Sequence, residues 1–136
     1  MPGNRAPSAH PEPRPRPQAP PPKVLHALDA SLTPLSPVTD IGDLTAYATA
    51  AVQAGQGNVL DASHVIFPNG AITLVLILAE SHLSIHTWPE ENLIAIDLFS
   101  CGAIDGPKVI DELVSLLRLE NVSLRQLARG TEASRG

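Results

Sequence analysis

The spacing of apolar residues changes period several times along the chain, and each change marks a new element of secondary structure. Val24 to Leu28 is a candidate first strand, and Pro34 and Pro37 break the segment after it. Thr39 or Asp40 can then cap a helix, which two nearby glycines end. The apolar positions of this helix keep to one face: Ile41, Leu44, Ala48, Ala51 and Val52.

Four segments after this helix have the character of strands. They are Asn58 to Phe67, Ile72 to Leu78, His82 to Trp88 and Leu93 to Phe99. Pro68-Asn69-Gly70 is a turn sequence between the first two. Ile72 to Leu78 has the apolar character of a strand covered on both faces, although periodicity alone does not exclude a helix there.

A second helix opens at Asp105-Gly106-Pro107, and Val122 to Leu127 closes the body as a final strand. The apolar positions of the helix are Val109, Ile110, Leu113, Leu116 and Leu117. The order β-α-β-β-β-β-α-β predicts an α/β (α+β) two-layer sandwich, in which two helices cover one face of a mostly antiparallel sheet.

Proline content divides the chain into a leader and a body. Nine of the 14 prolines precede Lys23, so residues 1–22 are predicted to be a disordered, Pro-rich leader. The leader is either a solvated tail or a contact for a partner. Residues 23–129 form one domain, and residues 130–136 are expected to be a flexible tail.

The net charge of −5 is unevenly distributed. Residues 24–127 carry −9, against +3 before them and +1 after them. This body is unsuited to nucleic acid and favours small cationic ligands. The longest strongly apolar run has nine residues, where a membrane helix needs about 20. The lone cysteine, Cys101, cannot form an intramolecular disulfide, so a cytoplasmic setting is expected.

The segment from Glu80 to Glu90 carries the chemistry. In an extended chain His82, Ser84, His86 and Trp88 share one face. Two imidazoles, hydroxyls and an indole therefore gather on one polar surface, which a purely structural strand does not require.

The residues alone leave three interpretations open. His82 and His86 could bind a metal, although no third ligand stands at zinc-like spacing. They could be structural histidines of a core or interface. Alternatively, Ser81 could be a nucleophile served by a nearby base, with Cys101 as a second proton-transfer group.

Two longer motifs provide a resemblance. The run Ala79-Glu80-Ser81-His82-Leu83-Ser84-Ile85-His86-Thr87-Trp88-Pro89-Glu90 resembles the self-cleavage motif of the prokaryotic S-adenosylmethionine decarboxylase proenzymes. The run Ala95-Ile96-Asp97-Leu98-Phe99-Ser100-Cys101-Gly102 is similar to the second signature of that family. The similarity is strong over residues 58–102 and weaker but collinear from residue 23 to 129.

The resemblance implies self-cleavage between Glu80 and Ser81. An N→O acyl shift and β-elimination would turn Ser81 into a pyruvoyl group, which forms a Schiff base with the substrate amine, so neither pyridoxal phosphate nor a metal is called for. By the same resemblance, His86 is the proton acceptor in processing and Cys101 the proton donor in catalysis. The family forms homodimers of cleaved protomers, with sites shared across the interface.

The departures from the family pattern lie on the substrate side. Ala27 stands where the family commonly has Glu, and Thr73 stands where it usually has the processing-support Ser. Ile66 occupies the position of an aromatic that comes one residue later, as Phe67, and one step along a strand reverses the face. If the strand keeps that register, Phe67 points away from the site. The candidate substrate-binding residues are Phe67, Trp88 and Glu90.

The resemblance implies decarboxylation of S-adenosylmethionine to the aminopropyl donor for spermidine synthesis. Because Ile66 replaces the aromatic, L-ornithine or L-arginine decarboxylation by the same chemistry is the alternative. A hypothesis of another class is a non-catalytic binding or regulatory homologue.

Overall fold

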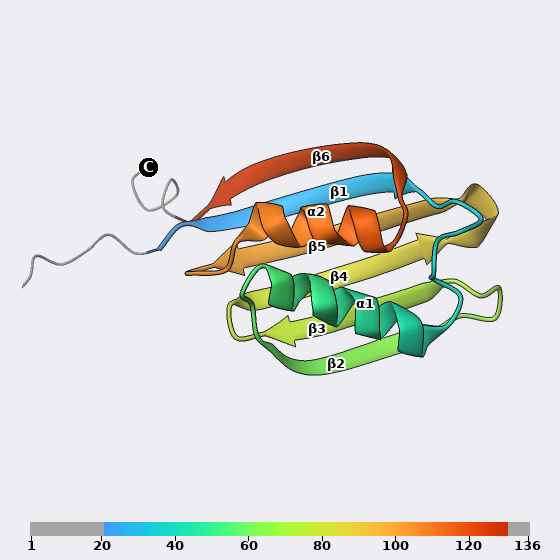
Figure 1. Ribbon diagram of the computed structural model, residues 1–136, viewed down its shortest axis with the longest axis horizontal. Coiled ribbons are helices and arrows are strands. Elements are labelled where there is room, and N and C mark those ends of the chain that lie inside the picture. Colours follow the sequence, from blue (N-terminus) through green and yellow to red (C-terminus); the bar gives the residue numbers. More distant parts are fainter. Residues whose placement is uncertain (1–20, 131–136) are drawn as a thin grey trace, which may run out of the picture.

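The computed structural model describes residues 21–130, which form two layers (Figure 1). One layer is a six-stranded sheet, and the other consists of two helices that lie side by side across one face of it. In chain order the elements are β1 (Lys23–Ser31), α1 (Ile41–Ala54), β2 (Val59–Ile66), β3 (Ile72–Leu78), β4 (Ser81–Trp88), the short 3-10 helix η2 (Pro89–Glu91), β5 (Leu93–Cys101), α2 (Gly106–Leu116) and β6 (Glu120–Arg129). The predicted two-layer fold is confirmed. The predicted leader and tail lie almost entirely outside the described residues.

The strand order in the sheet is β2-β3-β4-β5-β1-β6, and every neighbouring pair is antiparallel. Hairpin connections place β2, β3, β4 and β5 side by side in sequence order. The first strand instead inserts between β5 and β6, which places the two ends of the domain next to each other. Lys23 pairs with Cys101 on one side and with Arg129 on the other.

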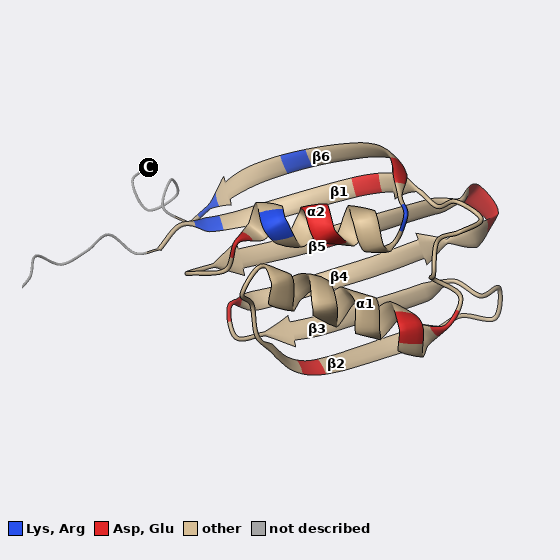
Figure 2. Ribbon diagram, in the orientation of Figure 1, with Lys and Arg blue, Asp and Glu red and all other residues tan. Residues whose placement is uncertain are grey.

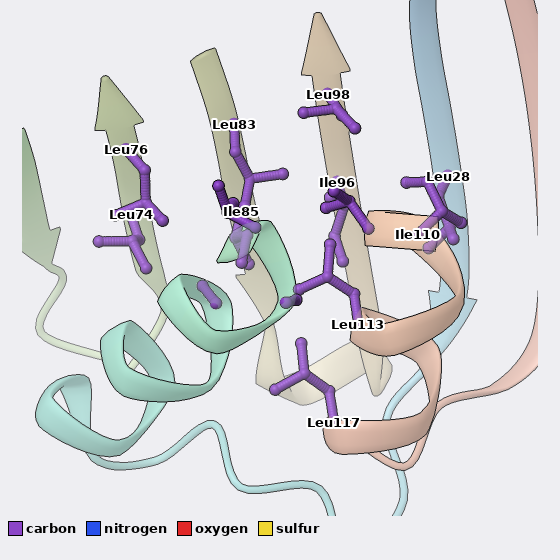
Figure 3. Close-up of a cluster of buried hydrophobic side chains, with 14 of the residues drawn as sticks. Leu28, Leu74, Leu76, Leu83, Ile85, Ile96, Leu98, Ile110, Leu113 and Leu117 are labelled. Atoms are coloured by element: carbon purple, nitrogen blue, oxygen red, sulfur yellow. The ribbon is translucent and has the colours of Figure 1, made fainter. Parts of the chain in front are cut away.

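The hydrophobic core fills the space between the sheet and the helices (Figure 3). Alternate residues of the central strands point toward the helices, as the period of two requires. Leu83 and Ile85 of β4 are fully buried there, on the side of the sheet that faces Leu113 of α2 and Leu117, the residue that follows this helix. Burying each side chain of this size contributes about 1.5–3 kcal/mol.

The other face of the sheet is open in the single chain. Ile77 of β3 is 47% exposed, and Thr73 and Val75 are only half-buried. The expectation that Ile72–Leu78 is covered on both faces is therefore wrong for one copy of the chain. The helices cover one side of β3, and nothing in the described chain covers the other.

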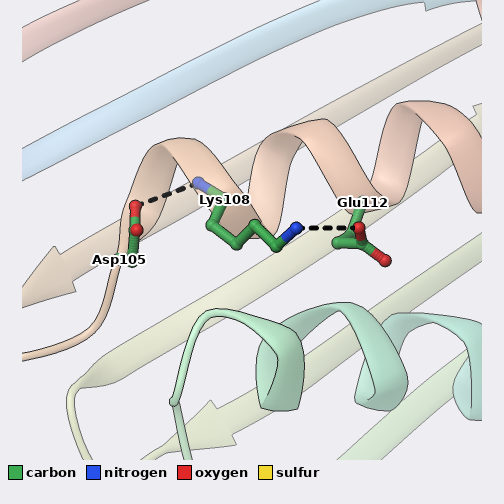
Figure 4. A network of polar contacts seen from close by, with 3 residues as sticks. All are labelled: Asp105, Lys108 and Glu112. Carbon is green, nitrogen blue, oxygen red and sulfur yellow. Dashed lines mark hydrogen bonds and ion pairs between the residues drawn. The ribbon is translucent and has the colours of Figure 1, made fainter.

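Both helices begin at an aspartate that caps them. Asp40 accepts a hydrogen bond from the backbone N–H of Asp43 (3.0 Å), and Asp105 accepts one from that of Lys108 (3.1 Å). In α2 the ammonium of Lys108 also lies 3.3 Å from Glu112, one helical turn on (Figure 4). That pair is solvent-exposed, so the cap contributes more to the start of the helix than the ion pair does.

Lysine and arginine are unevenly distributed over the molecule. No Lys or Arg occurs between Lys23 and Lys108. The charged side chains of α1, β2 and η2 are therefore all acidic, and β3 and β4 carry no Asp, Glu, Lys or Arg (Figure 2). In the part of the chain that the structure describes, neither helix has the length and apolar character of a bilayer span.

Candidate active site

The β3–β4 hairpin holds the bond at which self-cleavage was predicted. Leu78 pairs with Ser81, so Ala79 and Glu80 alone form the connection. Ser81 is half-buried and has φ = +145°. Positive φ is rare for a residue with a Cβ, and such a conformation costs about 1–3 kcal/mol. The backbone is therefore strained on the C-terminal side of the Glu80–Ser81 bond.

Asn58, the residue just before β2, forms hydrogen bonds with this turn. The Glu80 carboxylate accepts one hydrogen bond from the backbone N–H of Asn58 (3.1 Å) and another from its side-chain amide (3.0 Å). The N–H of Ala79 donates to the carbonyl of Asn58 (2.9 Å). Both residues of the turn are thus tied to one asparagine, which the sequence analysis did not single out.

Cys101 lies at the same end of the sheet as Ser81. It is the last residue of β5, and His82 of β4 pairs with Phe99 two residues before it. The thiol is free and half-buried. The rings of His82 and Phe99 meet edge-on at 6.0 Å, and the guanidinium of Arg129 lies 5.6 Å from the centre of the Phe99 ring. This end, with Ser81 and Cys101, is called the cleavage end below.

His86 and Thr73 lie together at the opposite end. They pair across β3 and β4, and Thr73 Oγ1 is 3.1 Å from His86 Nδ1. This contact orients the imidazole. Both residues line a cavity of about 340 Å³, together with Phe67, Asn69, Ala71, Ile72, Thr87 and Trp88. This region is called the cavity end below.

Two of the candidate substrate-binding residues line the cavity, and the third lies at its rim. Trp88 is 39% exposed, and its ring centre is 6.2 Å from that of His86. Phe67 lines the same cavity, so the expectation that it points away is wrong. Strand β2 ends at Ile66, and the alternation of faces does not extend to the next residue. Glu90 accepts a hydrogen bond from the side-chain amide of Asn69 (2.9 Å), which the sequence analysis also missed.

The two ends are far apart within one chain. Ser81 and His86 are separated by five residues of β4, which at about 3.3 Å per residue spans roughly 16 Å. A hydroxyl and its base must approach to about 3 Å for proton transfer. One protomer therefore does not bring Ser81 and His86 together.

The open face of the sheet extends from the cleavage end to the cavity end. Leu83 and Ile85 point into the core, so His82, Ser84 and His86 lie on the open face, as the alternation predicted. Asp97 of β5 is in register with Ser84 on one side and with Ala27 on the other. It places a carboxylate beside the alanine where the family commonly has Glu. Among the described residues, no three His, Cys, Asp or Glu side chains cluster as a metal site requires.

His26 lies on the other side of the sheet, beneath α2. Its Nε2 is 3.4 Å from Ser100 Oγ and its Nδ1 is 3.1 Å from the side-chain nitrogen of Gln126. Burial lowers the pKa of His26 below 6.5. A Cβ on Gly106 would collide with the His26 ring, so the first turn of α2 packs directly on this neutral imidazole.

Comparison with known proteins first defines the fold. The solved structure of the adenosylmethionine decarboxylase from Aquifex aeolicus superposes with a TM-score of 0.72 at 24% identity, covering 82% of this chain and 93% of that one. The S-adenosylmethionine decarboxylase family model then matches residues 26–130. The chain belongs to the S-adenosylmethionine decarboxylase family.

Curated relatives match this chain at higher sequence identity than the solved structure does. A proenzyme from Bacillus cereus is 42% identical over 83 residues, which are 60% of this chain and 67% of that protein. A proenzyme from Symbiobacterium thermophilum is 45% identical over 85 residues, covering 62% and 64%. One from Brevibacillus brevis is 50% identical over 64 residues, covering 46% and 47%. The chain thus spans about half to two thirds of the length of the relatives it matches. Each is named an S-adenosylmethionine decarboxylase proenzyme.

Proposed function

We propose that the chain cleaves itself between Glu80 and Ser81 and then decarboxylates S-adenosylmethionine, giving the aminopropyl donor for spermidine synthesis. The observation that carries the proposal is the positive φ of Ser81, a strained serine that directly follows a two-residue turn. Strain at a non-glycine residue persists where the surrounding structure imposes it, and such residues concentrate at functional sites.

The processing chemistry needs only the groups of the turn and a base. The Ser81 hydroxyl attacks the Glu80 carbonyl carbon, the C–N bond breaks, and the nitrogen takes the hydroxyl proton, leaving an ester. Loss of the Ser81 Cα proton then breaks the bond between Cβ and Oγ of Ser81. The main-chain carboxylate of Glu80 leaves, and Ser81 becomes a dehydroalanine. Water adds to this residue and ammonia leaves, so the second chain begins with a pyruvoyl group.

Ser81 fits the origin of this group because its side-chain oxygen lies one carbon from Cα and can both attack and leave. The pyruvoyl carbonyl supplies an electron sink for the electron pair released with CO₂. The Cys101 thiol, at the same end of the sheet, donates the proton to the product carbon. His86, oriented by Thr73 at 3.1 Å, accepts the proton in processing.

We further propose that two copies share each site. The separation of roughly 16 Å between Ser81 and His86 along β4 supports a site that a second copy completes. If two open sheet faces pack together around a two-fold axis that runs perpendicular to the strands, the cleavage end of one protomer meets the cavity end of its partner. The partly exposed apolar side chains of β3 also gain a covering layer in this dimer.

The cavity end suits S-adenosylmethionine better than ornithine or arginine. Phe67 and Trp88 offer two aromatic rings around the cavity. An adenine can stack on both, whereas arginine offers only its smaller guanidinium plane and ornithine has no planar side-chain group. Glu90 offers a carboxylate at the rim, held by Asn69. The acidic half of the molecule favours the sulfonium and ammonium charges of this substrate (Figure 2).

Mass spectrometry of the purified, denatured chain tests the cleavage. The expected products are residues 1–80 and residues 81–136 with a blocked N-terminus, and Ser81→Ala should remain intact. A wild-type chain that stays whole would refute the proposal.

Release of CO₂ from S-adenosylmethionine, ornithine and arginine, offered separately, tests the substrate. Cleavage without any CO₂ release would instead support the non-catalytic homologue.

Mixed dimers test the shared site. Ser81→Ala and His86→Ala should each fail to cleave alone. When the two are co-expressed, the His86→Ala chain should be cut, because the partner supplies the missing imidazole. If the mixture stays uncut while wild-type chains cleave, the sites are not shared in this way.

A further inference from the structure

Asn58 lies directly across the turn that contains the proposed cleavage bond. Its backbone and side chain together make three hydrogen bonds with the turn, two to the Glu80 carboxylate and one from the N–H of Ala79. Asn58 precedes β2, and its own side chain is exposed. It therefore lies outside the hydrophobic core, and the hydrogen bond that its side chain makes is with the turn.

These contacts oppose the relaxation of Ser81. A two-residue turn at the surface can change its backbone angles readily unless something fixes it. Fixing both Ala79 and Glu80 leaves the next residue little freedom to move to negative φ. The Glu80 carbonyl, which the Ser81 hydroxyl must attack, belongs to the residue whose side chain is held at two points.

We propose that Asn58 is a positioning residue for self-cleavage, which it promotes by holding Glu80 and the strained turn. The inference rests on the proposed function, because it concerns the same bond. Asn58 acts through Glu80 and not on Ser81 itself. Its side-chain amide is the part that counts, since the backbone N–H donates whatever residue stands there.

Asn58→Asp tests the role of the amide. The change keeps the shape, removes the side-chain donor and places a second carboxylate against Glu80. The rate at which the 81–136 fragment forms, followed by mass spectrometry from the moment of synthesis, should fall at least about tenfold, as expected for a lost hydrogen bond to a charged acceptor. Asn121→Asp is the matched control. It alters an exposed asparagine at the other end of the sheet, bonded to Ser31, and should leave the rate unchanged.

Exchanging the donor and the acceptor between residues 58 and 80 distinguishes a positioning role of Asn58 from an effect on stability. In Asn58→Asp combined with Glu80→Gln, the glutamine amide donates to the new carboxylate and its oxygen still accepts from the backbone. The double variant should cleave as fast as Glu80→Gln alone, although Asn58→Asp by itself is slow. Thermal melting of each variant in the uncleavable Ser81→Ala background confirms that the domain remains folded.

The outcomes distinguish this inference from the proposal beneath it. If wild-type protein cleaves and Asn58→Asp cleaves equally fast, Asn58 has no positioning role while the proposed function stands. A slow double variant would also overturn the inference, because it would show that the contact itself does not set the rate. If the wild-type chain never cleaves, the proposed function fails first.

Discussion

The hydrogen bond between Thr73 and His86 gives a quantitative test of the cavity end. Thr73→Val keeps the β-branched shape and removes only the hydroxyl that lies 3.1 Å from His86 Nδ1. A hydrogen bond of this kind contributes about 0.5–1.5 kcal/mol net. If all of it supports the oriented imidazole in the transition state, cleavage at Ser81 slows about two- to twelvefold. Thr73→Ser keeps the oxygen and frees χ1, so its rate should match or exceed that of the wild type.

A matched control lies one residue beyond the histidine. Thr87 points toward the helices, is buried, and accepts a hydrogen bond from the N–H of Ile72 (2.9 Å). Thr87→Val makes the same chemical change but leaves a buried donor unsatisfied, at a cost of about 1–3 kcal/mol. With an unfolding entropy of about 0.23 kcal/mol/K for a domain of this size, the melting temperature should fall by about 4–13 °C.

The assay pairs fragment formation, followed by mass spectrometry, with melting followed by circular dichroism in the Ser81→Ala background. Thr73→Val should slow cleavage with little effect on melting. Thr87→Val should lower the melting temperature by more than Thr73→Val does. Equal cleavage rates for Thr73→Val and wild type would refute the role of the Thr73 hydroxyl. The same conclusion follows if both variants slow cleavage only in proportion to their loss of stability.

Three further outcomes follow from the structure. Leu113→Ala removes a fully buried side chain between α2 and the sheet and should destabilise the domain by about 3–5 kcal/mol, measured by urea unfolding. His26 has a lowered pKa, so the unfolded chain takes up its proton first as pH falls. The free energy of unfolding should therefore decrease below about pH 6.5, and His26→Gln should flatten this dependence. Asn69→Ala releases Glu90 at the cavity rim and should raise KM for S-adenosylmethionine in steady-state assays, leaving the cleavage rate unchanged.

The alternating part of the fold was predictable from local pattern. Strand β4 shows why: Leu83 and Ile85 alternate with His82, Ser84 and His86, and a period of two places each set on its own face. The prediction for the largely apolar β3 was wrong for a single chain. Apolar residues on both faces of a strand indicate two covering layers, and a single chain provides only one. The bounds of β1 were placed too short at Leu28. Pairing with β5 and β6 extends the strand through polar Asp29 to Ser31, and no local signal shows this.

The candidate site was predictable as a set of residues but not as an arrangement. The motif identified Ser81, His86 and Cys101, yet only the sheet register shows that the histidine lies at the opposite end from the other two. Asn58 and Asn69 carried no sequence signal, since a single asparagine before a strand or in a turn is common. Their hydrogen bonds to Glu80 and Glu90 span 22 and 21 residues of sequence and exist only once the strands have paired.

The insertion of β1 between β5 and β6 determines how the two products of cleavage remain together. The fragment ending at Glu80 would contribute β1, β2 and β3, and the fragment from Ser81 would contribute β4, β5 and β6. Because the sheet interleaves strands of both fragments, separating them requires breaking three ladders at once: β3 with β4, β1 with β5 and β1 with β6. Unfolding of an uncleaved protomer yields one molecule, whereas unfolding of a cleaved protomer yields two. The melting temperature of a protomer should thus acquire a new dependence on protein concentration once its backbone is cut.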